Sequence, residues 1–231
     1  MDREKAGPSY LKLNLKQVIN RNMQHIKIIF CWLLIASVSI FGTTLNIEKS
    51  SLQGKPPIRW VVEKSSTLRI SGKSNVNAFS CSIKGYNGTD TIYCSEDGER
   101  KTVRLNGGLE IDVFEFDCQR QLITKDLRKT LKEKQYPKLI ISFLTLESLP
   151  SMKNKTQNIK GWVEVELAGV RKCFQIPFEF SNHDGNSFVL NGKKIFCFSD
   201  FKLSAPQKLG GAIQVKDEFI VDFGLKIRSI K

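Results

Sequence analysis

Histidine is scarce in this chain of 231 residues, with two copies, His25 and His183, and no Cys-x-x-Cys motif occurs. Two histidines argue against a His-rich metal site or a multi-histidine catalytic centre, and the missing dithiol motif argues against a zinc ribbon or a redox dithiol. The 7 Pro and 16 Gly exclude a collagen-like or Pro-rich architecture. Apolar residues make up 41% and charged residues 26%, which is the balance of a globular protein.

One long uncharged run, Ile28 to Gly42, lies near the N-terminus. Basic residues precede it and small polar residues follow it, which is the order of a secretory signal. A spanning helix needs roughly 20 apolar residues, so this run of 15 favours a cleaved signal over a retained anchor formed by residues 28–45. We therefore predict a signal peptide or membrane anchor over 1–44, a linker over 45–57, and export of the rest to the periplasm or cell envelope.

Basic residues outnumber acidic ones by 36 to 23, and the part from residue 45 on keeps 30 against 21. In an exported domain this excess is better explained by anionic lipid headgroups, by polyanionic envelope polymers or simply by solubility than by nucleic acid. A membrane surface is thus one partner that the charge allows, and no nucleic-acid partner is expected.

Five cysteines follow the N-terminal segment: Cys81, Cys94, Cys118, Cys173 and Cys197. Asn87-Gly88 is a strong hairpin signal, and a hairpin centred there places Cys81 opposite Cys94 in a non-hydrogen-bonded pair, where side chains lie closest. The same counting about Gly185 pairs Cys173 with Cys197. These two pairs are the disulfide candidates, which leaves Cys118 as a buried free thiol or as a rival partner for Cys81.

The remaining pattern is mainly β, with period-two alternation bounded by turn signals. The predicted strands are 58–63, 67–71, 78–86, 89–95, 109–116, 139–147, 159–167, 171–180, 187–198 and 219–227. The first two are expected to pair as a hairpin, and Ala168-Gly169 is expected to turn one strand into the next. One helix is predicted over 124–134, with Thr124 as its N-cap and Pro137 beyond its end. This pattern predicts a single all-β domain over 58–231, an antiparallel sandwich or barrel.

Three motif blocks, in order, carry a family resemblance. They run from Trp60-Val61-Val62 to Ala78-Phe79, from Lys125-Asp126-Leu127 through Tyr136-Pro137 to Phe143, and from Phe201 through Leu209-Gly210 and Asp217-Glu218-Phe219 to Phe223. Together they resemble the YceI-like family of exported lipid (polyisoprenoid)-binding proteins, over about Ile58 to Ile230. The resemblance implies a lipocalin-like, eight-stranded antiparallel β-barrel with one short helix, which holds an isoprenoid chain in an apolar tunnel.

A tunnel of this kind needs apolar side chains on the inward faces of the strands. The candidate lipid-binding residues are Phe143, Val163, Val165, Phe174, Ile176, Phe178, Phe196, Phe198, Phe219, Val221 and Phe223. The alternative is that these alternating residues simply fill the barrel core, as they do in many small barrels.

Catalytic and metal sites find little support, and we predict neither. Glu164 and Glu166 alternate with Val163 and Val165, which is typical of a solvent-facing strand surface. The basic residues of the predicted helix (Lys125, Arg128, Lys129, Lys132, Lys134) either touch a lipid phosphate near the barrel mouth or form a solvated face. The sequence thus predicts an exported, non-enzymatic carrier or sink that requires no cofactor beyond a bound polyisoprenoid lipid, with a ligand-free structural or interaction barrel as the alternative.

Overall fold

The computed structural model describes residues 56–98, 102–151, 153, 155–182 and 186–230. The predicted signal or anchor segment, most of the linker, and His183 lie outside these residues. Residues Gln53–Lys231 form one compact unit, and the buried hydrophobic cluster within it extends from Trp60 to Ile227. This unit therefore has a hydrophobic core of its own, as a folded domain does. None of the helices in the described ranges is long and apolar enough to cross a bilayer.

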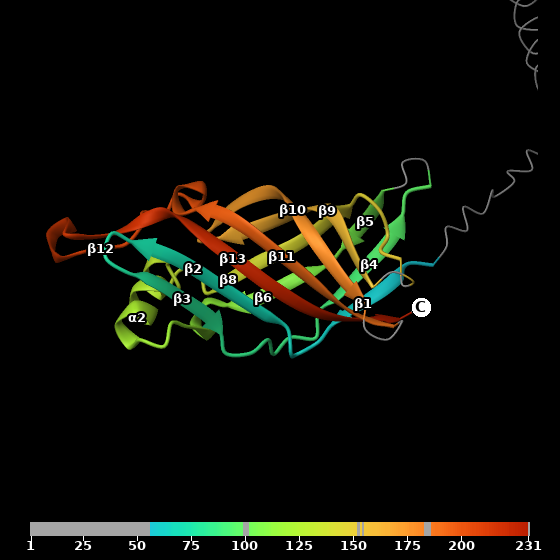
Figure 1. Cartoon of the computed structure of the whole chain (residues 1–231), viewed down its shortest axis with the longest axis horizontal. Coiled ribbons are helices and arrows are strands. Elements are labelled where there is room, and N and C mark those ends of the chain that lie inside the picture. The colour runs from blue at the N-terminus through green and yellow to red at the C-terminus, as the bar shows by residue number, and fades with distance from the viewer. Residues whose placement is uncertain (1–55, 99–101, 152, 154, 183–185, 231) are drawn as a thin grey trace, which may run out of the picture. The chain divides into compact units, whose positions relative to one another are not determined.

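The chain forms the strands and helices shown in Figure 1. The strands are β1 (Ile58–Val62), β2 (Thr67–Ser74), β3 (Ala78–Ile83), β4 (Thr91–Glu96), β5 (Val103–Asn106), β6 (Gly108–Asp112), β7 (Phe116–Asp117), β8 (Lys138–Leu146), β9 (Thr156–Leu167), β10 (Val170–Asn182), β11 (Ser187–Cys197), β12 (Gln207–Lys208) and β13 (Ile213–Ile230). The helix is α2 (Gln121–Thr130), and the 3-10 turns are η1 (Val113–Glu115), η2 (Phe198–Phe201) and η3 (Leu209–Gly211).

A closed antiparallel barrel is the core of the architecture. Within the described chain, eight strands form the circuit β1-β4-β5-β8-β9-β10-β11-β13, and β13 pairs back with β1. The long strand β13 pairs with β11 along one edge, and with β2 and then β1 along the other. The predicted eight-stranded barrel with one helix is therefore confirmed.

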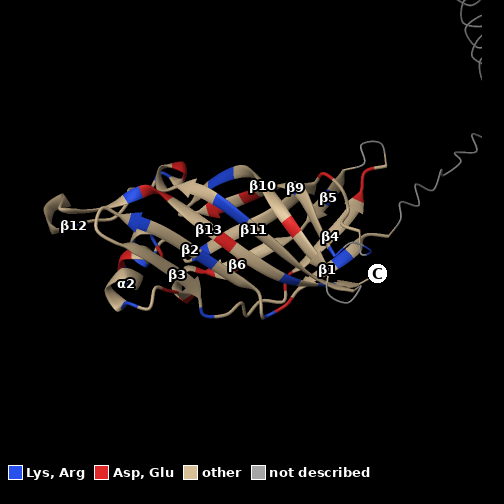
Figure 2. Cartoon of the chain, in the orientation of Figure 1, with Lys and Arg blue, Asp and Glu red and all other residues tan. Residues whose placement is uncertain are grey.

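Two ends of the barrel are distinguished below. The helix end carries α2, β12, η3 and the turn between β2 and β3, whereas the terminal end carries β1, β4 and the chain's C-terminus (Figure 1). Charged residues of both signs lie along the strands (Figure 2). On β9, Val163 and Val165 are buried, whereas Glu166 points outward and its Oε2 lies 2.6 Å from Arg171 Nε. The predicted solvent face of this strand is confirmed.

The β9–β10 hairpin follows directly from the local sequence. Leu167 pairs with Val170, and Ala168 and Gly169 form the two-residue turn with φ of 51° and 79°. Positive φ at both positions defines a type I′ turn, whose twist matches that of the flanking strands. A Cβ at Gly169 would lie 2.6 Å from the Tyr136 ring, so this position also lacks room for a side chain.

The predicted Asn87-Gly88 hairpin is wrong. In the described sheet, β3 pairs with β2 and β7, whereas β4 pairs with β1 and β5, so both edges of each strand are occupied by other partners. Residues 84–90 form a connecting loop, in which the buried Tyr86 donates its hydroxyl hydrogen bond to Asp90. The predicted pairing of the first two strands is also wrong, because β1 and β2 follow one another along the same edge of β13.

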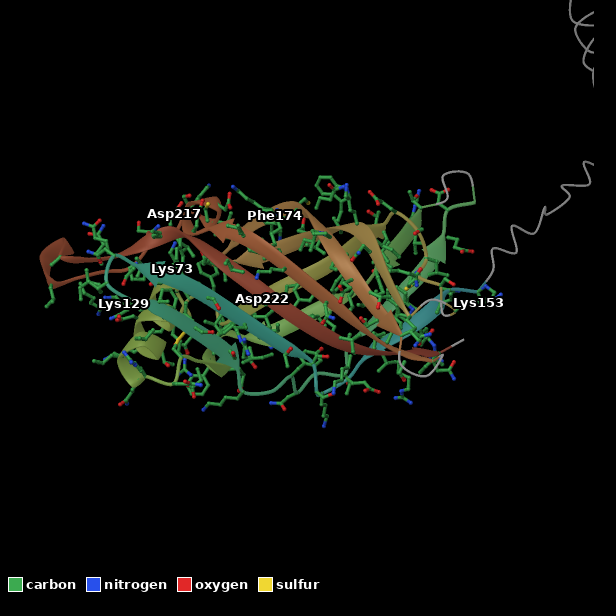
Figure 3. The ribbon with its side chains drawn as sticks, viewed as in Figure 1. Lys73, Lys129, Lys153, Phe174, Asp217 and Asp222 are labelled. Carbon is green, nitrogen blue, oxygen red and sulfur yellow. A yellow bond between two sulfur atoms is a disulfide. The ribbon has the colours of Figure 1, made fainter. Side chains whose placement is uncertain are left out.

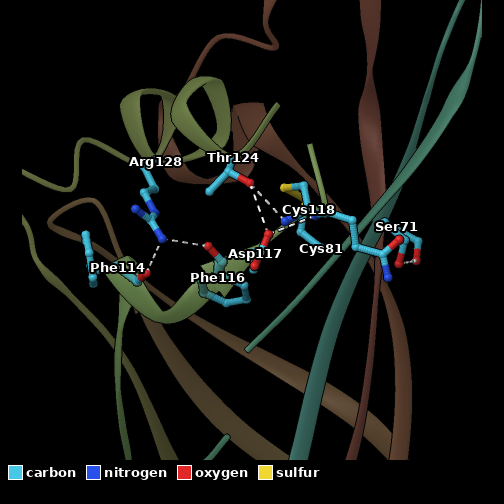
Figure 4. The surroundings of a disulfide bond; sticks show 10 residues. Ser71, Cys81, Phe114, Phe116, Asp117, Cys118, Thr124 and Arg128 are labelled. Carbon is cyan, nitrogen blue, oxygen red and sulfur yellow. Dashed lines mark hydrogen bonds between the residues drawn. A yellow bond between two sulfur atoms is a disulfide. The ribbon is translucent and has the colours of Figure 1, made fainter. Parts of the chain in front are cut away.

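The disulfide candidates need correction for the same reason. Cys81 is bonded to Cys118, the partner that the sequence left open, and Cys94 is a buried free thiol (Figure 4). Cys173 and Cys197 are free as well. The register counted about Gly185 is correct for Phe178 and Gly192, but the pairing of β10 with β11 ends there, and Cys173 instead lies opposite Glu164 and Cys197 opposite Glu218.

The helix begins three residues before the predicted N-cap. Thr124 lies inside α2, and its hydroxyl accepts a hydrogen bond from the Cys118 backbone N–H at 3.0 Å. The Arg128 guanidinium donates to the carbonyls of Phe114 and Phe116 and lies 4.1 Å from the Phe114 ring centre. The disulfide and these bonds fasten the segment that leads into α2 against β3 (Figure 4).

The Cys81–Cys118 bond is expected to contribute substantially to stability, because it closes a loop with a sequence separation of 37 residues. Cys118→Ser should lower the free energy of unfolding by about 3 kcal/mol, equivalent to a melting temperature lower by roughly 6–12 °C. Thermal unfolding followed by circular dichroism measures this change. Cys173→Ser, at an exposed free thiol, is the matched control and should leave the melting temperature unchanged. A reductant that destabilises Cys118→Ser as much as the native chain would contradict this assignment.

Candidate ligand-binding site

An apolar cavity lies inside the half of the barrel nearer the helix end. Its volume is about 60 Å³. Eight of the predicted lipid-binding residues line it: Phe143, Val163, Val165, Ile176, Phe196, Phe219, Val221 and Phe223. The lining is completed by Leu68, Ile70, Leu109, Leu139, Ile141, Leu167, Phe201 and Leu225.

Three predicted residues lie elsewhere. Phe178 is buried beyond the cavity, with its ring centre 6.3 Å from that of Phe143 and 5.9 Å from that of Phe223. Phe198 is buried in η2, and its ring centre is 4.7 Å from that of Phe219. Phe174, labelled in Figure 3, is partly buried and packs against Phe196, with ring centres 4.8 Å apart, but it does not line the cavity.

The cavity ends on the side of the terminal end at a boundary that we call its floor, and two inward-facing glycines determine where this floor lies. A Cβ at Gly161 would lie 2.7 Å from the Phe178 ring, and a Cβ at Gly192 would lie 2.0 Å from the Phe223 ring. Both rings therefore occupy space that only glycine leaves free. Beyond this floor, Trp60, Phe180 and Phe188 fill the terminal half of the barrel with ring contacts of 5.1 to 6.1 Å. The alternation of apolar residues alone does not show that one half of the barrel holds a cavity and the other half is filled. In the sequence, Gly161 and Gly192 at inward positions indicate where the two halves meet.

The chemistry of the cavity is uniformly apolar. Every described residue that lines it has a hydrocarbon side chain, so the walls offer no hydrogen bond and no charge to a ligand. Such walls select hydrocarbon by burial, at about 0.8 kcal/mol for each CH₂ removed from water. The volume is well below the roughly 300–1,000 Å³ of typical ligand pockets, so a long ligand requires movement of the lining side chains.

The barrel wall is weakest beside the cavity. Residues 170–177 of β10 pair with β9 but not with β11, and residues 193–197 of β11 pair with β13 but not with β10. Pro177, which has no backbone N–H, stands where the β10–β11 pairing stops. We refer to this unpaired stretch as the seam. The turn η2 follows β11 here, and its Phe201 lines the cavity with its ring centre 5.9 Å from that of Phe174.

Asp200 holds η2 in place. Its carboxylate accepts hydrogen bonds from the Cys197 backbone N–H and from Lys172 Nζ of β10, each at 3.0 Å. The backbone hydrogen bond, followed by the lysine, holds the pKa of Asp200 below its ordinary value of 3.8. The contact between Lys172 and Asp200 therefore joins β10 to η2 across the seam.

A reactive thiol and a metal site each place requirements on the cysteines and the possible metal ligands of the described residues. The described residues contain no group of three or more His, Cys, Asp or Glu side chains that could hold a metal ion. Burial raises the pKa of Cys94 to about 12, and burial together with nearby carboxylates raises that of Cys197, so neither thiol is an activated nucleophile. Cys118 is oxidised in the disulfide.

The predicted basic helix is only partly a free cationic surface. Arg128 is bound to the two carbonyls of residues 114 and 116, as described above. Lys125, Lys129, Lys132 and Lys134 border a groove of about 890 Å³ beside α2, together with Lys84, Asp117 and Glu133. This groove contains both signs of charge, and it is separate from the apolar cavity.

Solved structures of known proteins share this fold. A polyisoprenoid-binding domain from Saccharophagus degradans, implicated in plant cell wall breakdown, matches with a TM-score of 0.52 at 9% identity and covers 74% of this chain and 98% of that one. BcnA from Burkholderia cenocepacia matches with a TM-score of 0.51 at 16% identity, covering 70% and 95%. A YceI protein from Campylobacter jejuni gives a TM-score of 0.45 at 16% identity, covering 69% and 85%.

No protein-family model and no curated protein sequence matches this chain. The structural matches establish the fold, and the barrel is the one that the resemblance to the YceI-like family predicted.

The contribution of Asp200 to the stability of the fold depends on pH. Because its pKa is lower in the folded chain, its charge stabilises the fold above the ordinary pKa of 3.8, and this contribution is lost as the pH falls through the folded-state value. Asp200→Asn should lower the melting temperature by about 2–4 °C at neutral pH and by progressively less below the ordinary pKa. Asp222→Asn, in the wall pair with Lys193 at 3.7 Å, is the control and should have a smaller effect at neutral pH. A difference between native and Asp200→Asn that is constant across pH would contradict this role.

Proposed function

We propose that this protein is a non-enzymatic lipid-binding protein that holds the apolar part of a long ligand, a polyisoprenoid, inside the barrel. The observation that carries the proposal is the cavity inside the barrel, whose described lining residues all have hydrocarbon side chains. Its fold is shared with a domain described as polyisoprenoid-binding, which supports this ligand class. Repeated isoprene units suit such walls because each buried CH₂ contributes about 0.8 kcal/mol and no polar group needs a partner.

The small volume is compatible with ligand binding. An empty void of about 300 Å³ would cost about 7 kcal/mol at roughly 24 cal/mol per Å³, which is comparable to the entire stability of many domains. A ligand-free barrel is therefore expected to close its side chains into the space. Val221 and Phe223 are only partly buried, so the wall formed by β13 has room to yield.

The turn η2 is the element that we expect to move when a ligand enters. It is the cover whose Phe201 reaches the cavity, and it sits at the seam, where the barrel has no continuous strand pairing to break. It is held by the bonds of Asp200 to Cys197 and Lys172 and by two hydrogen bonds that Ser199 donates, from its backbone N–H and its hydroxyl, to Asp217. Opening at this turn costs a few hydrogen bonds, whereas opening elsewhere in the wall breaks a strand ladder.

We further propose that the protein is exported and acts as a carrier or sink of this lipid. The uncharged run at residues 28–42, with basic residues before it, supports export. The Cys81–Cys118 disulfide suits an oxidising compartment such as the periplasm.

The second candidate is a ligand-free structural or interaction barrel. The observation that favours it is the cavity volume of about 60 Å³, because an eight-stranded barrel can be filled by its own side chains. In that case the apolar lining residues serve only as the hydrophobic core of the barrel, and the protein does not bind added lipid.

Ligand binding is tested on the chain from residue 45 on, purified from an exporting host and examined by native mass spectrometry and solvent extraction. We expect a co-purifying apolar species, or uptake of an added prenyl alcohol such as geranylgeraniol. Val163→Phe inserts a ring into the cavity and should weaken uptake at least about tenfold, a loss of roughly 1.4 kcal/mol. Trp162→Phe, at the outward-facing neighbour that is 46% exposed, should bind as the native chain does.

Thermal unfolding of both variants shows whether they fold. If Val163→Phe does not fold, Val221→Phe replaces it, because this substitution places a ring in the partly buried wall formed by β13. A native chain that carries no lipid and takes up no prenyl alcohol would overturn the carrier proposal and favour the filled barrel.

A further inference from the structure

The helix end of the barrel leaves large aliphatic side chains in contact with water. Leu209 of η3 is 79% exposed, Leu122 of α2 is 78% exposed, and Val76 of the β2–β3 turn is 57% exposed. Leu209 and Leu122 are the two most exposed large hydrophobic residues of the described chain. None of these three side chains belongs to the hydrophobic core, and all three lie on elements of the same barrel end (Figure 1).

The three segments that carry these residues are bonded to one another. The Asn75 side chain donates to the Ala212 carbonyl at 2.9 Å and accepts from the Gln214 backbone N–H at 3.0 Å, which joins the β2–β3 turn to the segment after η3. Lys208 Nζ donates to Asp126 Oδ1 at 2.7 Å, which joins β12 to α2. The exposed residues therefore belong to one connected surface.

Lysines accompany the apolar side chains. Lys125 and Lys129 follow Leu122 at spacings of three and seven residues, so all three share one exposed face of α2. Lys73 and Lys216 are exposed on β2 and β13, and Lys73 and Lys129 are labelled at this end in Figure 3. Asp126 is neutralised by Lys208, whereas Asp217 and Glu218 remain as nearby acidic groups.

A groove of about 230 Å³ lies between the same segments. Its lining combines apolar residues, among them Val76, Ile123 and Phe198, with the charged residues Arg120, Asp126 and Lys208. The Phe198 ring lines the groove and packs at a tilt of 42° against Phe219, which lines the barrel cavity, with ring centres 4.7 Å apart, so this pair of rings lies between the groove and the cavity.

We propose that the helix end docks on the surface of an anionic lipid bilayer, with Leu122, Leu209 and Val76 inserted among the acyl chains. Charge complementarity selects this occupant, since each lysine near an anionic bilayer surface contributes favourably and aliphatic side chains partition into the interfacial region. A protein partner fits less well, because the cores of protein interfaces are depleted of lysine and enriched in aromatic residues. Docking places the groove, and the ring pair behind it, against the lipid.

Co-sedimentation with vesicles tests this surface, using the chain from residue 45 on, which contains the whole folded unit. We expect binding to vesicles of phosphatidylcholine mixed with phosphatidylglycerol, little binding to phosphatidylcholine alone, and weaker binding as salt is raised. Leu122→Ser with Leu209→Ser should reduce the partition coefficient at least about tenfold. Ile195→Ser, at a residue that is 58% exposed on β11, is the matched control and should bind as the native chain does.

The charged part is tested separately with Lys125→Gln and Lys129→Gln, which should weaken binding by about fivefold for each lysine. The matched pair Lys160→Gln and Lys226→Gln, on β9 and β13, should leave binding unchanged. All substituted side chains are exposed or lie outside the core, and equal melting temperatures confirm that each variant folds. Absence of binding to anionic vesicles, or an equal loss in the Ile195 variant, would overturn the proposal without affecting the test of lipid uptake by the cavity.

Discussion

The pairing of β13 along both of its edges is the constraint on which the rest of the structure depends. This strand of 18 residues binds β11 on one side and both β2 and β1 on the other, and its contact with β1 closes the ring. Closure satisfies the backbone groups of the strands without a long free edge and encloses one face of every strand. The apolar residues at alternate positions then have no other place than the interior, which is why the cavity has hydrocarbon walls.

Closure is incomplete at one place, and the features of the site gather there. The seam between β10 and β11 begins at Pro177, and η2 covers it with Phe201 on the inside and Asp200 on the outside. Because Cys173 and Cys197 lie beyond the last β10–β11 pair, each keeps a free thiol on the exposed or partly exposed surface. The continuously paired strands thus provide the walls of the cavity, whereas η2, a short turn held by a few hydrogen bonds, covers the seam.

Features encoded within a short stretch of sequence could be predicted, and those that depend on distant partners could not. The alternation in β9 and β13 and the turn at Ala168-Gly169 were sufficient to place those strands, since strand period and type I′ turns are local properties. The Asn87-Gly88 hairpin failed although its turn signal is strong, because β3 pairs with β2 and β4 pairs with β1, and the local turn signal gives no information about these partners. The disulfide prediction failed with it, since Cys118 approaches Cys81 only through β7, η1 and the start of α2. For the site, alternation predicted inward positions for Phe143, Val163 and Phe196, which line the cavity, but it gave no depth along the barrel axis, so Phe178 was grouped with them.

The two inward glycines give the barrel a property that composition does not show. Gly161 and Gly192 seat the rings of Phe178 and Phe223 across the interior, and Trp60, Phe180 and Phe188 fill the space behind them. If the cavity holds a hydrocarbon chain as proposed, these rings bound that chain on the side of the terminal end. The positions of the two glycines along β9 and β11, more than the width of the barrel, would then set the length of chain that can be buried.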